Sequence, residues 1–88
     1  MEKDRIAELV MVTKRPTLEE AQKFVGGYVE LLWLDATTQM LVNEEGAYDE
    51  SLLPNPMATR LAEKAGYLVT IGGIKGNAMV LTKGAIWD

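Results

Sequence analysis

Residues 28–34, with the sequence YVELLWL, carry an apolar or aromatic side chain at every position except Glu30. The run is short and rich in strand-forming residues, which predicts a β-strand. Successive side chains of a strand point to opposite faces, so Val29, Leu31 and Trp33 share one face and the other four residues share the second. Because both faces are largely apolar, both need to be covered. We therefore expect a central strand, or a strand covered by a second subunit.

The segment before this strand carries the signals of a short helix. Thr17 and Glu20 are spaced as a capping box, in which the threonine hydroxyl accepts from the Glu20 amide and the glutamate reaches back to the Thr17 amide. Apolar residues then recur at helical spacing, and Gly26 and Gly27 supply a left-handed stop. These signals predict a helix that begins after Thr17 and ends before Gly26.

The rest of the chain predicts five more elements. Strand-forming runs predict strands at residues 6–13, 39–43, 67–71 and 78–82. Asn55 as N-cap and Pro56 at the first helical position predict a second helix, which Gly66 closes. The order β-α-β-β-α-β-β predicts a small single α+β domain over residues 1–88, with a mainly antiparallel sheet and two helices on one face.

The 88 residues contain neither histidine nor cysteine. These two residue types supply most general bases near neutral pH, most nucleophile–base pairs and most zinc ligands. The single serine, Ser51, has no residue resembling a base near it in the sequence. We therefore predict a protein that is not an enzyme and that uses no cofactor.

The charge and hydropathy of the chain argue against two classes of partner. The net charge is −4, whereas proteins that bind a phosphate backbone concentrate positive charge. The only local basic group is Lys14-Arg15, so we do not expect a nucleic-acid partner. Residues 1–5 are mostly charged and no apolar run approaches about eighteen residues, which predicts neither a signal peptide nor a membrane span. We expect a soluble, cytoplasmic protein.

Four pieces of sequence occur in a distinctive order: GGYVE, VNEEG, NPMAT and GNAMVL, at residues 26–30, 42–46, 55–59 and 76–81. Together they resemble a family of small domains of unknown function found mostly in bacteriophages, prophages and plasmids. The resemblance covers residues 18–82, and this chain departs from the family pattern by a longer connection between Ala62 and Ile74. It implies a viral or mobile-element accessory protein that acts in a bacterial cytoplasm, and it implies no catalytic residue.

Residues 72–77 form a glycine-rich loop that contains a lysine. A GxxG loop can let backbone amides approach a phosphate. This pattern predicts a site for a nucleotide or another phosphate-bearing ligand, formed by Gly73, Lys75, Gly76 and Asn77, with Lys75 as the cation. The alternative interpretation is that the glycines serve a tight connection between strands, which requires positive φ.

Acidic residues gather in the segment after the second predicted strand of the hairpin, at Glu44, Glu45, Asp49 and Glu50. Clustered carboxylates suit calcium or magnesium, but the spacing lacks the alternating ligands of an EF-hand. The simpler interpretation is a solvated exit from the hairpin, and we predict no metal site. Glu30 is either a functional carboxylate or a charge that is solvated or paired across the sheet.

Aromatic and methionine side chains are enriched where proteins meet. We predict interface roles for Tyr28, Trp33, Met40 and Trp87, with a core role left open for the two tryptophans. The main hypothesis is a non-enzymatic, phage-type accessory protein that acts by protein–protein interaction, as a homodimer that also binds a host protein. The alternative is a small-ligand binding module that uses the loop at residues 72–77.

Overall fold

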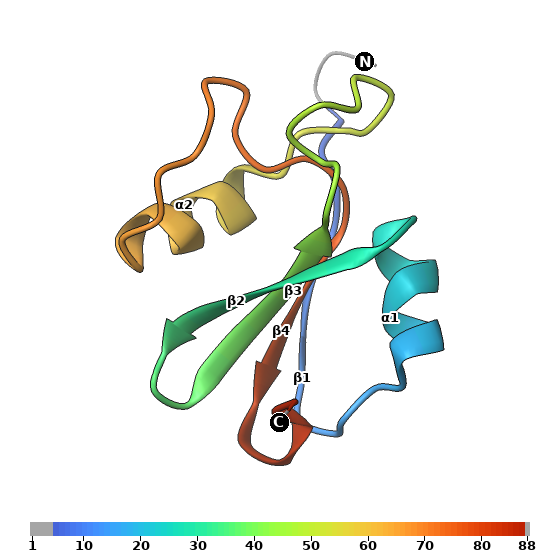
Figure 1. The fold of residues 1–88 in the computed structure, drawn as a ribbon, viewed down its shortest axis with the longest axis vertical. Helices are drawn as coiled ribbons and strands as arrows, with labels where there is room; N and C mark the ends of the chain where they lie inside the picture. The colour runs from blue at the N-terminus through green and yellow to red at the C-terminus, as the bar shows by residue number, and fades with distance from the viewer. Residues whose placement is uncertain (1–4, 88) are drawn as a thin grey trace.

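The computed structural model describes residues 5–87 and contains a four-stranded sheet flanked by two helices (Figure 1). The α+β class predicted from the sequence is confirmed. In chain order the elements are β1 (Leu9–Val12), α1 (Leu18–Val25), β2 (Val29–Asp35), β3 (Thr38–Asn43), α2 (Pro56–Lys64) and β4 (Ala78–Thr82), followed by a single 3-10 turn (Lys83–Ala85).

The strands lie in the order β1-β4-β3-β2. β2 pairs antiparallel with β3 and β3 pairs antiparallel with β4, whereas β1 pairs parallel with β4. β2 is therefore an edge strand. Of the two expected alternatives, the central position is wrong, and cover by a second subunit stays a prediction. A strand that is apolar on both faces thus borders solvent along one side.

Local sequence signals set the ends of both helices. The Glu20 amide donates to Thr17 Oγ1 at 3.0 Å and the Thr17 amide donates to Glu20 Oε1 at 2.9 Å, which confirms the capping box of α1. Gly26 follows α1 with φ +87°, a conformation that glycine adopts without steric cost. Asn55 caps α2, since its Oδ1 accepts from the Ala58 amide at 3.1 Å.

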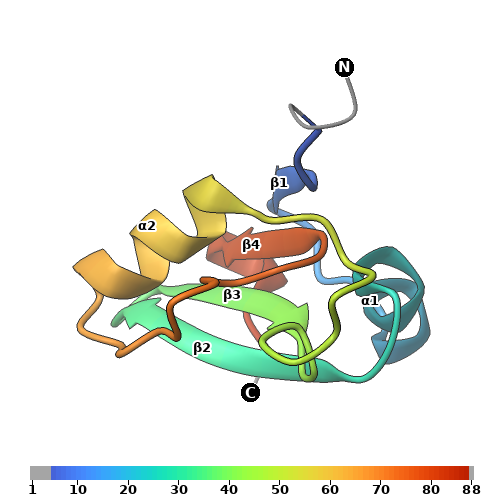
Figure 2. The ribbon, with the colours of Figure 1, turned by 90° about the horizontal axis from the view of Figure 1, so that it is seen from above.

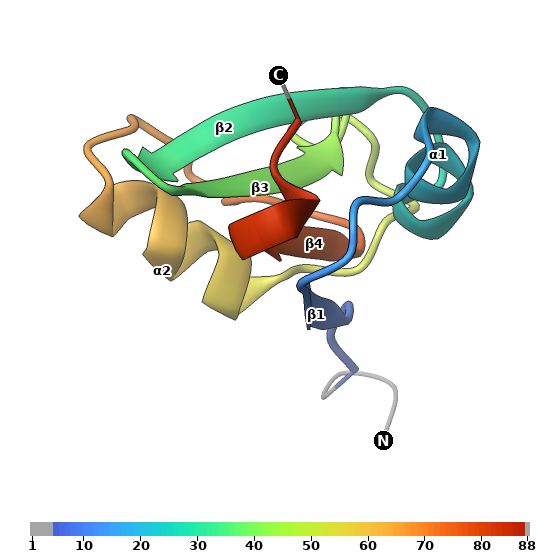
Figure 3. The same cartoon turned by 90° about the horizontal axis from the view of Figure 1, so that it is seen from below.

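The two helices pack on opposite faces of the sheet. Met40 and Val42 of β3 lie on one face of the sheet, and Ala58 and Ala62 of α2 cover that face. The alternate residue Leu41 belongs to the other face, which α1 covers through Ala21, together with Met79, Leu81 and Ala85. Figures 2 and 3 show α1 and α2 on different sides of the strands. The expected placement of both helices on one face is therefore wrong. Successive apolar residues of β3 and β4 point to opposite faces of the sheet, so each face needs its own cover.

Residues 67–71 do not form the predicted strand, because they pair with no strand of the sheet. Tyr67 and Val69 pack against the apolar cluster under α2, while Leu68 and Ile71 are fully exposed. Partly buried and exposed residues alternate over residues 67–70 as in a strand, but the segment lies over a face of the sheet instead of along its edge. Strand propensity cannot distinguish these two placements, because it reports how side chains fit a half-buried surface.

Both helices are short, with 8 residues in α1 and 9 in α2. A helix needs about 20 apolar residues to cross the hydrocarbon core of a bilayer. Within residues 5–87, no helix has the length and apolar character that a membrane span requires.

Candidate functional site

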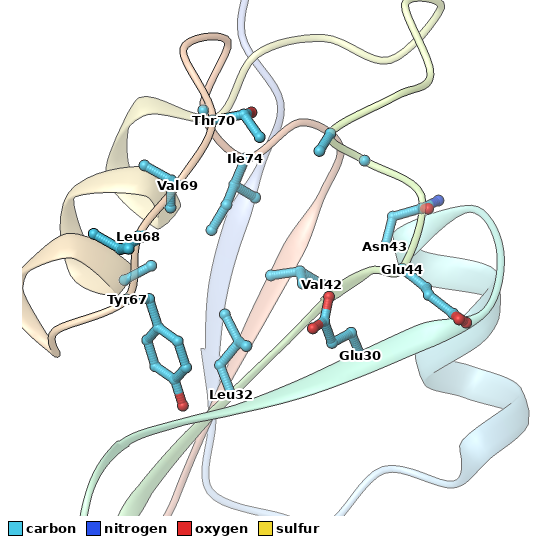
Figure 4. A pocket seen from close by; sticks show the side chains of 14 residues that line it. Glu30, Leu32, Val42, Asn43, Glu44, Tyr67, Leu68, Val69, Thr70 and Ile74 are labelled. Atoms are coloured by element: carbon cyan, nitrogen blue, oxygen red, sulfur yellow. The ribbon is translucent and has the colours of Figure 1, made fainter.

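A groove of about 170 Å³ lies between residues 67–74 and the hairpin of β2 and β3 (Figure 4). Leu32 and Val42 form its apolar floor, and Glu30 projects into it from β2. Tyr67, Val69 and Ile74 line one side, and Glu44 borders the other side with its carboxylate pointing away from them. The groove therefore combines an apolar floor with the carboxylate of Glu30, and Glu44 lies at its rim.

The Tyr67 side chain reaches from this groove to the free edge of β2. The Trp33 amide donates to Tyr67 Oη at 3.0 Å, and the Tyr67 hydroxyl donates to the Trp33 carbonyl at 3.1 Å. In an antiparallel pair, residues alternate between those whose backbone groups face the neighbouring strand and those whose groups face away. The backbone groups of Val29 and Leu31 therefore face away from β3, as those of Trp33 do.

Apolar side chains are exposed around this edge. Trp33 is 46% exposed, Tyr28 is 72% exposed, and Leu68, which lines the groove beside Tyr67, is fully exposed. Isolated exposed apolar residues are common on soluble proteins, but several around the unpaired edge of one strand mark an interaction surface. We call Tyr28, β2 and residues 67–70 the β2-edge surface.

The structure separates the four predicted interface residues. Tyr28 and Trp33 belong to the β2-edge surface. Met40 is fully buried between the sheet and α2, so its interface assignment is wrong and it is a core residue. Trp87 packs partly buried on the α1 side, where its indole N–H donates to the Pro16 carbonyl at 3.2 Å. Its backbone amide and carbonyl both bond to the buried side chain of Gln39.

Sequence reasoning missed Tyr67 and Leu68 as parts of this surface. The signal was present in the apolar run at residues 67–71, which carries apolar side chains at both alternate sets of positions. Its interpretation as a paired strand assigned these side chains to the core.

The glycine-rich loop uses its backbone donors within the protein. The amides of Gly73, Ile74 and Gly76 donate to the Thr70 carbonyl, to Thr59 Oγ1 and to the Leu53 carbonyl, each at 2.8 Å. A phosphate cradle requires several free amides that point at one place. Gly73 and Gly76 have φ of +74° and +92°, as the structural interpretation of these glycines requires. The ligand site at Gly73, Lys75, Gly76 and Asn77 stays a prediction.

The acidic segment and the glycine-rich loop touch at Gly46, where an added Cβ would lie 2.6 Å from the Lys75 carbonyl oxygen. Hydrogen bonds from the Ser51 hydroxyl and from the Ser51 amide lower the pKa of Asp49, and the charge of Lys75 adds to this effect. In the part of the chain that the structure describes, no three acidic side chains gather in a way that could hold a metal ion.

Three asparagines of the distinctive sequence pieces join separate segments of the fold. Asn43 Nδ2 donates to the Val25 carbonyl at 3.0 Å, which ties β3 to the end of α1. Asn77 Oδ1 accepts from the Glu8 amide at 2.8 Å, which ties the start of β4 to the chain before β1. Asn55, at the start of α2, also bonds to two other segments. These residues have structural roles that account for their prominence in the sequence.

Comparison of the chain with protein-family models, with curated proteins and with solved structures returned no match. The resemblance to phage and plasmid domains therefore stays a prediction.

Proposed function

We propose that this chain is a non-enzymatic protein-interaction domain whose binding surface is the β2-edge surface. The observation that carries the proposal is the position of β2: a strand with apolar residues on both faces has a neighbour on one side only. Extended segments of partner proteins commonly bind by adding a strand to such an edge.

The partly covered side chains of β2 support this assignment. Val29, Leu31 and Leu32 are each partly exposed, and Trp33 retains nearly half of its accessible surface. Tryptophan is enriched among the residues that contribute most to binding energy, because it buries a large area with few rotatable bonds. Burial of these side chains by a partner would complete the cover that a two-sided apolar strand needs.

The proposed setting follows from the resemblance to phage, prophage and plasmid domains. It is a bacterial cytoplasm, and the proposed partners are a host protein, bound at the β2-edge surface, and a second copy of the chain, bound elsewhere on the molecule. A phage-type accessory protein of this kind needs a binding surface and no catalytic group.

The proposal predicts that Trp33 is required for partner capture. The tagged protein, its Trp33→Ala variant and a Met11→Ala control are used to purify partners from a bacterial lysate, and bound proteins are quantified by mass spectrometry. Met11 is a suitable control because it is 69% exposed but lies on β1, at the opposite edge of the sheet. We expect Trp33→Ala to weaken capture by about 30-fold, the effect of a residue worth about 2 kcal/mol at an interface.

The control should retain the same partners as the wild-type protein. If Trp33→Ala retains every partner that the Met11→Ala control retains, the β2-edge surface is not the binding surface and the proposal fails. Thermal unfolding of each variant checks that lost capture does not reflect a lost fold.

A further inference from the structure

The free edge of β2 is only partly occupied from within the chain. The Tyr67 hydroxyl bonds to both outward-facing backbone groups of Trp33. The outward-facing groups of Val29 and Leu31 lie further along the same edge, beyond the reach of that bond. Three residues, Val29, Glu30 and Leu31, thus offer a short length of strand edge with one hydrogen-bonding position at each end.

Self-pairing of this edge meets an electrostatic obstacle in one register. An antiparallel pair that joins Val29 to Leu31 of a second copy sets the two Glu30 residues directly opposite each other. This central pair is of the non-hydrogen-bonded type, in which side chains come closest. Like charges directly opposite each other destabilise a sheet, and each copy also carries a net charge of −4.

The symmetric register centred on Leu31 meets a different obstacle, because it needs hydrogen-bonding groups that are already used. A pair that joins Leu31 to Leu31 of a second copy sets Trp33 opposite Val29 and requires the outward backbone groups of Trp33. Those groups are already bonded to the Tyr67 hydroxyl. A third register, centred on Val29, would set Leu31 opposite Gly27, whose amide already donates to the Gln22 carbonyl at 3.1 Å. Each of these three self-pairings of β2 therefore faces two carboxylates or requires a backbone group that is already bonded.

A foreign strand with a basic residue at its centre meets neither obstacle. Opposite Glu30, a lysine or arginine forms a favourable cross-strand pair. Its side chain would lie on the α2 face of the sheet, where Glu30 and Glu44 both border the groove and an adjoining hollow that Tyr48 also lines. Glu30 and Glu44 are both exposed, so they remain available to a charge on a partner.

Resting on the proposed function, we infer that the β2 edge binds an extended basic segment of a different protein. The segment pairs antiparallel with Val29–Leu31 and places a lysine or arginine opposite Glu30. The Tyr67 hydroxyl and Glu30 together act against pairing with a second copy at this edge.

The test uses two peptides that differ at one position, acetyl-Thr-Val-Lys-Val-Thr-amide and the same peptide with glutamate at its centre. Each is titrated to millimolar concentration into the full ¹⁵N-labelled chain, and amide signals are followed by NMR. We expect the lysine peptide to shift the amide signals of Val29 and Leu31 in a saturable manner. The glutamate peptide should bind roughly fivefold more weakly, the effect of replacing one attractive cross-strand pair by a repulsive one.

Two sets of variants separate the effect of charge on peptide affinity from the effect of backbone hydrogen bonding. Glu30→Lys should reverse the preference, so that the glutamate peptide binds more tightly. Val29→Pro removes an outward amide and should weaken the lysine peptide by about tenfold, whereas Val29→Ala shortens the side chain, keeps the amide and should change affinity by less than about threefold. If Val29→Pro does not fold, the exchange of charge at Glu30 decides the question by itself.

Equal binding of the two peptides, no saturable shift at Val29 and Leu31, or an unchanged preference in Glu30→Lys would overturn the inference. It would also be overturned if light scattering showed a wild-type dimer whose Val29 and Leu31 amides are protected from hydrogen exchange. The peptide test can fail while Trp33→Ala still loses its captured partners. In that case the proposed function stands, because the capture experiment tests the surface and not the chemistry of its ligand.

Discussion

At the residue scale, the buried side chain of Asn55 makes three hydrogen bonds. Its Oδ1 caps α2 by accepting from the Ala58 amide, while its Nδ2 donates to the carbonyls of Glu8 and Gly76 at 3.0 and 2.9 Å. The Asn55 side chain therefore holds the start of α2 against the segments that lead into β1 and β4. Only an amide side chain supplies both the acceptor and the two donors.

Asn55→Ala should lower the free energy of unfolding by about 2–4 kcal/mol, because it removes the cap and leaves two carbonyls without this donor. Asn55→Ser is the matched control: its hydroxyl can keep the cap, so it should lose less stability. Urea unfolding monitored by circular dichroism measures both. A loss of less than about 0.5 kcal/mol in Asn55→Ala would contradict this account, since that is the range of ordinary surface substitutions.

At the scale of the elements, the turn of the β2–β3 hairpin helps to hold the edge strand β2 against β3. Asp35 Oδ1 accepts from the Thr37 amide at 2.8 Å and from the Thr37 hydroxyl at 3.2 Å. The Thr37 amide, followed by the Thr38 hydroxyl, lowers the pKa of Asp35 below its ordinary value. The charged carboxylate therefore favours the closed turn and with it the pairing of β2 to β3.

This shift predicts a dependence of stability on pH. A carboxyl group whose pKa is lower in the folded state stabilises the fold above its unfolded pKa of about 3.9, and this contribution is lost as the pH falls through the folded value. Thermal unfolding of the wild-type protein and of Asp35→Ala, measured between about pH 6 and about pH 2, tests this. The difference between the two melting temperatures should shrink as the pH falls below about 4, and a constant difference would refute the role of Asp35.

At the scale of the whole molecule, two thin apolar layers share one sheet. Met40 and Leu41 are adjacent in β3 and fully buried, yet they belong to the α2 layer and the α1 layer respectively. A chain of 88 residues buries a limited area, so neither layer is thick enough to be stable without the other. The shared strands β3 and β4 couple the two layers.

Met40→Ala and Leu41→Ala should each lower the free energy of unfolding by about 2–5 kcal/mol, the usual cost of a large-to-small core substitution. Because both layers depend on the same strands, each variant should unfold in one transition that fluorescence and circular dichroism report identically. The exposed control Met11→Ala should change stability by less than about 0.5 kcal/mol. Two separate transitions in either variant would show that the layers unfold independently.

The elements that could be predicted from the sequence are those whose signals act over a few residues. The cap at Thr17, the stop at Gly26, the cap at Asn55 and the hairpin turn after β2 involve contacts between residues that are four or fewer positions apart. The candidate site was predicted only in part. Tyr28 and Trp33 were identified from residue type, whereas Tyr67 was not, because its bond to Trp33 joins residues 34 positions apart.

By itself, the sequence determined the α+β class, both helices, the hairpin and the two-sided apolar character of β2, because local hydrogen bonding and side-chain periodicity set these features. Only the tertiary structure decided that β2 lies at an edge, that the helices cover opposite faces and that residues 67–71 remain unpaired. These outcomes depend on which distant segments pair, such as Leu9 with Ala78 in the β1–β4 pair. Strand periodicity specifies which side chains need cover, but the neighbour of each strand is chosen by the packing of the whole chain.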